Sequence, residues 1–398
     1  MGRNVWILSG ISLAVAIGFG VVAPVLPLYA NYFDASNFQA ATVIAVFALM
    51  RFVFSPAVGR LVDRFGHRQV LIGGLLIVAL SSAAAGLAPT LIWLIALRGV
   101  GGIGSAMFSV SGMSVLLSSV VPEKRGRAAG LYQGGFLLGA MAGPPVGGVF
   151  AQISLRAPFF FYAGTLMVAS VVALGLVRVG APGGQQDAVA DAGSSDNTQA
   201  LPWRVLAKDR RFQAACLANL VHGWNSHGTR AVLVPLFVGA TLATSNQQAA
   251  GWVGLAMMVA AGVQAALVWP AGWLVDRIGR RGPLVAGGLI SGVALAATPW
   301  AGSMVVLTLM LCCLAVGSAA LGSAPAALVG DAAGPAKERA VAVFSMCGDA
   351  GSIVGPLVAG ALADALSFKV AFVASAALWL VSTAVSWSLP RVRPVCPP

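Results

Sequence analysis

The most unusual residue of this sequence is Asp349, which interrupts the apolar segment SMCGDAGSIVGPLVAG. The chain has twelve Asp and Glu residues, and this one alone falls inside a long apolar run, about two turns from one end. A carboxyl group in apolar surroundings prefers its neutral form, so Asp349 could carry a proton. The alternative is a structural ion pair with a nearby arginine.

Basic side chains in apolar runs are the natural partners of such a carboxylate. Arg98 opens the segment RGVGGIGSA, and a charge at a helix centre costs about 2.5–3.5 kcal/mol. Arg98 should therefore face a cavity or a partner, although backbone carbonyls could also satisfy it. In NLVHGWNSHGTRAVLVP, His222, Asn225 or Ser226, and Arg230 recur at helical spacing. This predicts a polar face toward a cavity or hydrogen bonds between helices.

The composition excludes a soluble protein. The 398 residues are 58% hydrophobic and 9% charged, whereas soluble domains carry about 25% charged residues. No phosphate-binding glycine loop, nucleophile–base pair or zinc-ligand spacing occurs, and the five Cys do not have metal-ligand spacing. We therefore expect no enzyme activity, no cofactor and no metal.

Twelve apolar runs are long enough to cross a bilayer as helices. They predict an all-α membrane protein with two six-helix bundles, at 1–177 and 212–390, a cytoplasmic linker at 178–211 and a cytoplasmic tail at 391–398. The runs lie near 5–30, 38–58, 70–88, 91–117, 128–152, 158–177, 213–241, 250–270, 284–301, 304–329, 341–363 and 370–389.

The distribution of Lys and Arg predicts the orientation of these helices. With the N-terminus in the cytoplasm, only Arg156 and Lys369 fall in outer loops. Such a bias favours cytoplasmic location of both termini. The net charge of +12 is then a topology signal, so nucleic acid is not an expected partner.

The two halves repeat one charged loop. GRLVDRFGHR begins at Gly59, and GWLVDRIGRR begins at Gly272. A turn with two glycines would let two helices reverse direction in a short loop. The basic residues suit the anionic inner leaflet, which also makes a purely topological anchor possible.

The two halves also repeat a glycine-rich segment. GPPVGG from Gly143 recurs as GPLVAG from Gly355. On these motifs nearly the whole chain resembles the major facilitator superfamily, in its twelve-helix drug:proton antiporter type. The helix-five motif of that type, G-x8-G-x3-G-P-x2-G-G, is complete: Gly130, Gly139, Gly143, Pro144, Gly147 and Gly148. It implies a hinge that favours exchange over symport, and plain helix packing is the alternative.

The resemblance also implies roles for other residues. Arg98 would take part in proton coupling with Asp349, Arg230 and His222. The two loops would be cytoplasmic latches that break on inward opening, formed by Gly59, Asp63, Arg64, Gly66 and Arg68, and by Gly272, Asp276, Arg277 and Gly279. The substrate cavity would be lined by Gln133, Phe136, Trp224, Asn225, Met257 and Gln264.

Together these features predict a secondary active transporter of two pseudo-symmetric bundles, with the proton gradient as its energy source. The expected activity is proton-coupled export of small amphipathic molecules by alternating access. Its partners would be a small-molecule substrate, protons and the lipid of a bacterial plasma membrane, and the unit would be a monomer. The alternatives are a symporter or uniporter for a sugar or organic acid, a channel, and a non-transporting membrane sensor.

Overall fold

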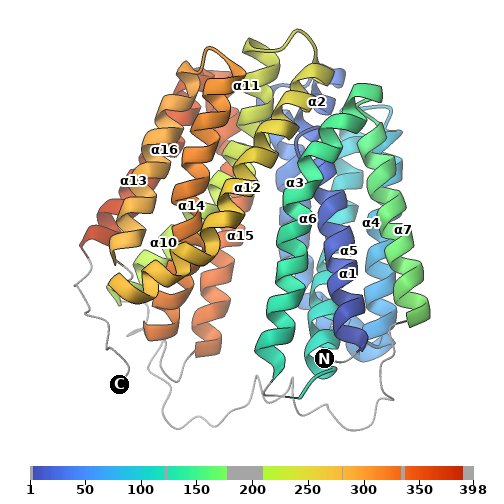
Figure 1. The fold of residues 1–398 in the computed structure, drawn as a ribbon. Helices are drawn as coiled ribbons and strands as arrows, with labels where there is room; N and C mark the ends of the chain where they lie inside the picture. Colours follow the sequence, from blue (N-terminus) through green and yellow to red (C-terminus); the bar gives the residue numbers. More distant parts are fainter. Residues whose placement is uncertain (1–2, 122–123, 177–208, 280, 333–336, 389–398) are drawn as a thin grey trace. The chain divides into compact units, whose positions relative to one another are not determined.

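The computed structural model describes residues 3–121, 124–176, 209–279, 281–332 and 337–388. Within these ranges it is helical, without strands (Figure 1). The elements of the first predicted half are α1 (Arg3–Val22), α2 (Leu26–Ala30), η1 (Asn31–Phe33), α3 (Asn37–Phe65), α4 (His67–Gly86), α5 (Leu91–Ser118), α6 (Arg125–Ile153) and α7 (Ala157–Leu176). Those of the second are α10 (Arg210–Gly223), η3 (Trp224–Leu233), α11 (Val234–Thr241), α12 (Asn246–Ile278), α13 (Arg281–Ala297), η4 (Thr298–Trp300), α14 (Met304–Ala332), α15 (Lys337–Ala365) and α16 (Phe368–Trp387).

Each of the twelve apolar runs coincides with helix, which confirms the all-α prediction. In the described ranges ten helices are long and apolar enough to cross a membrane, and a further apolar helix covers Met304–Ala319. Three predicted runs are not single α-helices, and the run at 284–301 ends in the short 3₁₀ helix η4. The run at 5–30 is interrupted by a turn between α1 and α2, where Pro24 lacks an amide hydrogen. The run at 213–241 is divided into α10, a π-helical segment η3 and α11.

Local sequence explains where the helices begin. Ser36 and Gln39 form a reciprocal capping box at the start of α3, which satisfies two amides that the helix leaves free. Thr90 accepts a hydrogen bond from the amide of Trp93 at the start of α5, and Asp209 accepts one from the amide of Arg211 at the start of α10 (2.7 Å). These caps fix the entry of three helices.

The contacts of the chain form two compact units. Unit 1 comprises 1–179, 227–258 and 356–368, and unit 2 comprises 180–226, 259–355 and 369–398. Unit 1 thus includes most of η3, all of α11 and pieces of α12 and α15, which the sequence assigns to the second bundle. Most of the predicted linker and the predicted tail lie outside the described residues.

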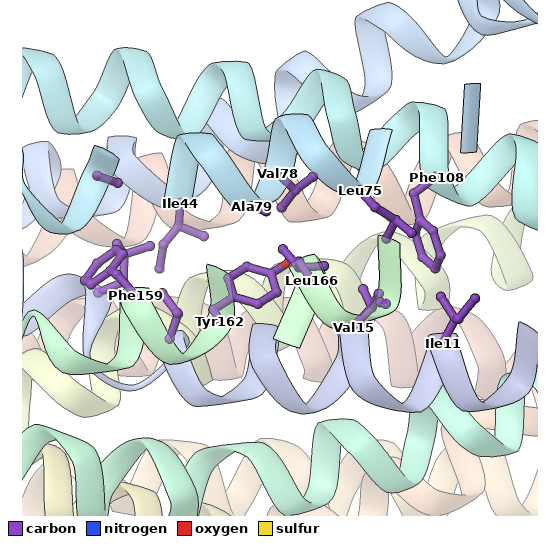
Figure 2. Close-up of a cluster of buried hydrophobic side chains, with 14 of the residues drawn as sticks. Ile11, Val15, Ile44, Leu75, Val78, Ala79, Phe108, Phe159, Tyr162 and Leu166 are labelled. Atoms are coloured by element: carbon purple, nitrogen blue, oxygen red, sulfur yellow. The ribbon is translucent and has the colours of Figure 1, made fainter. Parts of the chain in front are cut away.

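The core of unit 1 is built by α1, α3, α4, α5 and α7 around aromatic and branched side chains. Figure 2 shows Val15 of α1 near Leu166 of α7, and Ile11 and Phe108 in the same cluster. Tyr162 is 2% exposed within the same cluster. This packing holds α5, and with it Arg98, in a fixed position.

Unit 2 is held by close helix contacts at small residues. A Cβ atom on Gly317 of α14 would collide with the backbone of Gly287 in α13. Gly292 of α13 lies against Trp379 of α16, which is 1% exposed. Small residues at such contacts are how helices approach closely where lipid replaces water.

Candidate functional site

The helix-five motif packs α6 against α1. A Cβ atom on Gly139 would lie 2.5 Å from the carbonyl oxygen of Leu13, and one on Gly143 would lie 2.5 Å from the Cα of Gly20. Gly147 meets the backbone of Val21 in the same way. These glycines lie four residues apart, so they share one helix face, and Figure 1 shows the two helices side by side. We call this contact the α1–α6 seam.

The seam also includes Gly135, a glycine outside the motif that lies one turn before Gly139. Gly135 lies against the carbonyl oxygen of Ser9, at 2.7 Å from its built Cβ. Gly130, by contrast, has nothing within 4 Å of a Cβ, so the first motif position takes no part in packing. Gly148 points to a different helix, α12, where Gly251 lies 3.1 Å away.

Unit 2 repeats the seam between α10 and α15. Gly348 lies against the side chain of Asn219, at 2.6 Å from its built Cβ, and Gly355 lies 2.7 Å from the Cα of Trp224. Asn219 also donates a hydrogen bond to the carbonyl oxygen of Phe344 (2.7 Å). Because Asp349 follows Gly348 directly, the repeat fixes the position of its backbone.

Asp349 lies about two turns from the start of the spanning segment Val343–Ala365. Its side chain is half-buried and takes part in an interaction within the structure. A carboxylate at this depth is costly unless it is paired or serves a function. The structure thus places Asp349 inside a candidate spanning segment, and its role as a proton carrier stays a prediction.

Arg98 of α5 is buried, with 4% of its surface exposed. Its guanidinium carbon lies 4.4 Å from the ring centroid of Phe47, a distance at which a cation is attracted to an aromatic face. Its Nε atom has no hydrogen-bond partner in the described residues. Phe47, which belongs to the same unit, thus supplies part of the stabilisation of this charge.

The polar segment of the predicted run 213–241 has π-helical geometry. Trp224–Leu233 forms η3, which contains Asn225, His227 and Arg230. The backbone from Trp224 on is therefore not the α-helix that the spacing predicts, because a π-helix bonds residue i to i+5. Residues five apart, such as Asn225 and Arg230, lie on one face of a π-helix, and the polar face stays a prediction. Such segments are frequent at functional sites.

The predicted cavity residues have different exposures. Gln133 and Phe136 of α6 are exposed, Gln264 of α12 is half-buried, and Met257 is buried. Asn225 is 1% exposed. Trp224 donates its indole N–H to Ser375 of α16 (3.0 Å) and lies against Gly355, which makes it a packing residue of unit 2.

Each charged loop turns on one glycine, not two. Gly66 has φ +81 between α3 and α4, and Gly279 has φ +84 after α12. Gly59 and Gly272 lie inside α3 and α12, so the expected turn with two glycines is wrong. The helix continues through Gly59 and Gly272 because glycine can adopt helical angles at a small cost.

The basic residue after each turn holds the loop to the last helix of its half. Arg68 donates a hydrogen bond to the carbonyl oxygen of Leu174 in α7. The guanidinium of Arg281, the equivalent residue, lies 5.2 Å from the ring of Trp387 in α16. The repeat therefore extends to the contacts of these loops.

The remaining loop residues lie at the surface. Asp63 and Arg64 are exposed, and the guanidinium of Arg64 lies over the ring of Phe65 (5.4 Å). Arg277 lies over Trp273 (4.9 Å). The side chain of Asp276 is outside the described residues, so its predicted role as a latch remains a prediction.

We expect Gly66→Ala to lower the free energy of unfolding by about 1–3 kcal/mol, because its backbone conformation (φ +81, ψ 152) is open almost only to glycine. A Cβ at Gly66 meets nothing within 4 Å, so the loss is conformational strain alone. Gly59→Ala is the matched control, since Gly59 is also unobstructed but helical. Thermal unfolding of the purified variants measures both, and equal stabilities would contradict the assignment.

One polar contact escaped the sequence analysis. Asp364 at the end of α15 accepts hydrogen bonds from the amides of Asn37 (2.9 Å) and Phe38 (2.8 Å). The sequence does repeat the helix start that Asp364 contacts, because SNFQAA at Ser36 recurs as SNQQAA at Ser245. The repeat marks the starts of α3 and α12 as equivalent positions.

Comparison with known families agrees with this arrangement. The model of the Major Facilitator Superfamily matches residues 8–229 and 215–395. Multidrug resistance protein 1 of Bacillus subtilis (strain 168) is 32% identical over 163 residues, which are 41% of this chain and 42% of that protein. The class H tetracycline resistance protein of Pasteurella multocida is 35% identical over 167 residues, 41% of each chain. The alignments therefore span less than half the length of these relatives.

Solved structures share the fold over nearly the whole chain. A bacterial homologue of the human lysosomal transporter Spinster, in an inward-facing and occupied conformation, has a TM-score of 0.79 at 17% identity and covers 96% of this chain and 95% of its own. The nucleoside transporter NupG has a TM-score of 0.76 at 14% identity, with 96% and 98% covered. These neighbours confirm the predicted major facilitator fold. The chain belongs to the Major Facilitator Superfamily, a family of membrane transporters rather than enzymes, and is a multi-pass membrane protein.

Proposed function

We propose that this transporter exports small amphipathic molecules in exchange for protons, by alternating access. The observation that carries the proposal is the position of Asp349, a half-buried carboxylate two turns inside a spanning helix. The glycines before and after it bring α15 against α10. A carboxylate held in this way can bind and lose a proton when its surroundings change. The names of the relatives, multidrug and tetracycline resistance proteins, support export.

The balance of charged side chains in the spanning segments favours neutral or weakly anionic substrates. Arg98 is buried in α5, and Arg230 lies in the π-helical segment η3. By sequence the spanning segments hold three guanidinium groups, those of Arg51, Arg98 and Arg230, against the single carboxylate of Asp349, and this positive balance disfavours a strong cation. No cofactor is needed, because the proton gradient supplies the energy. We place the protein in a bacterial plasma membrane as a monomer, with both termini in the cytoplasm.

Everted membrane vesicles test the proposal directly. A preformed pH gradient is challenged with neutral, anionic and cationic amphiphiles, in vesicles with and without the protein. We expect neutral or weakly anionic compounds to release the gradient only where the protein is present. A gradient unchanged by every compound, together with saturable downhill flux, would instead establish a uniporter. A response to lipophilic cations alone would contradict the substrate class.

A further inference from the structure

The end of α15 is joined to the start of α3 by a carboxylate. One oxygen of Asp364 accepts from the amide (2.9 Å) and the side-chain nitrogen (2.7 Å) of Asn37, and the other accepts from the amide of Phe38 (2.8 Å). One turn earlier, Gly360 lies against α3, with its built Cβ 2.7 Å from the carbonyl oxygen of Asn37 and 2.9 Å from Ala41. All of these residues belong to unit 1.

This contact stabilises the junction without being needed by α3 itself. Amides in the first turn of a helix have no partner within the helix, and they carry a partial positive charge that favours an anion. Hydrogen bonds to a charged acceptor are about twice as strong as neutral ones. The capping box of Ser36 and Gln39 already closes the helix start, and water can replace Asp364 at this exposed end. The contact can therefore break while α3 stays folded.

The equivalent junction in the repeat carries no charge. Gln152 of α6 stands 212 positions before Asp364, and its side chain donates a single hydrogen bond to the carbonyl oxygen of Gln247 at the start of α12 (2.9 Å). The helices approach through Gly148 and Gly251, as they do at Gly360. The packing is thus repeated, but the polar contact is not. Asp364 is a charged acceptor of three hydrogen bonds, whereas Gln152 is a neutral donor of one.

We propose that Asp364, Asn37 and Phe38 form a charge-based outer latch, which must break before substrate leaves on the predicted outer side. The Gln152–Gln247 junction acts as a weaker spacer that opens with it. The asymmetry makes Asp364 the gating residue of the pair. This inference rests on the proposed transport cycle, because a latch has a role only if the chain alternates between states.

Labelling of a buried cysteine measures the latch without any transport assay. Ala41 is 0% exposed beside Gly360, so Ala41→Cys is placed in a variant whose five native cysteines are replaced by alanine. A membrane-impermeant maleimide is then added to intact cells. We expect Asp364→Asn to raise the labelling rate about tenfold, since it removes the charge and one acceptor. Asn37→Ala, which removes only the side-chain donor, should raise the rate less.

Gln152→Ala is the matched control, and it should leave the labelling rate within about twofold of the parent. An unchanged rate in both Asp364→Asn and Asn37→Ala would overturn the latch. An equal increase in Gln152→Ala would overturn its charge-based asymmetry. Vesicle flux of the parent is measured separately: increased labelling in a protein without proton exchange would contradict the proposed function and leave the latch standing.

Discussion

Asp349→Asn is expected to abolish proton release by added compounds in everted vesicles, bringing the rate to that of vesicles without the protein. Asparagine keeps the size and polarity of the side chain but cannot take up a proton. The backbone at this position is held by Gly348 and Gly355 against α10, so the variant should fold normally. Downhill efflux of a loaded compound should persist, because only the coupling to protons is removed.

Asp34→Asn supplies the matched control for this prediction. Asp34 is an exposed carboxylate with φ +53, a conformation that asparagine adopts readily. The same chemical change at this site should leave proton release intact. Proton release that survives in Asp349→Asn would move the proton site to another group, with His222 and His227 as the next candidates. Loss of both proton release and downhill efflux would indicate a structural ion pair instead.

The sequence predicts most of the fold because bilayer physics restricts the choices. A span needs about 20 apolar residues and must satisfy its backbone internally, so apolar runs read directly as helices. The repeat of charged loops and of glycine motifs indicates two equivalent halves. Even the contacts of Arg68 and Arg281 with Leu174 and Trp387 repeat at one spacing of 213 residues.

The features that sequence reasoning missed depend on tertiary contacts. The π-helical geometry of η3 cannot be read from residue spacing, because the same letters fit an α-helix. Gly130 matches the helix-five motif yet contacts nothing, while Gly135 lies outside it yet packs on Ser9. Only the neighbouring helix distinguishes them. Asp364 lies at the end of an apolar run, where a carboxylate is common, and only its hydrogen bonds to the start of α3 distinguish it.

The α1–α6 seam makes a second strong prediction, at Gly143. A Cβ there would lie 2.5 Å from the Cα of Gly20 and 2.6 Å from the carbonyl oxygen of Ile17. Both obstacles are backbone atoms, so no side chain can rotate away, and the helices must separate. We expect Gly143→Ala to lower the free energy of unfolding by about 1–3 kcal/mol, the cost of overpacking a tight contact. Thermal unfolding in a single detergent measures the change.

Gly130→Ala tests whether this loss comes from the seam or from any change in the motif. Gly130 lies in the same helix and has open space around it. Alanine favours helix over glycine by roughly 0.5–1 kcal/mol, so this variant should be as stable as the parent or slightly more stable. If both variants lose stability equally, the motif acts through backbone flexibility and the hinge interpretation gains support. If only Gly143→Ala does, close packing on α1 explains why the motif keeps glycine at that position.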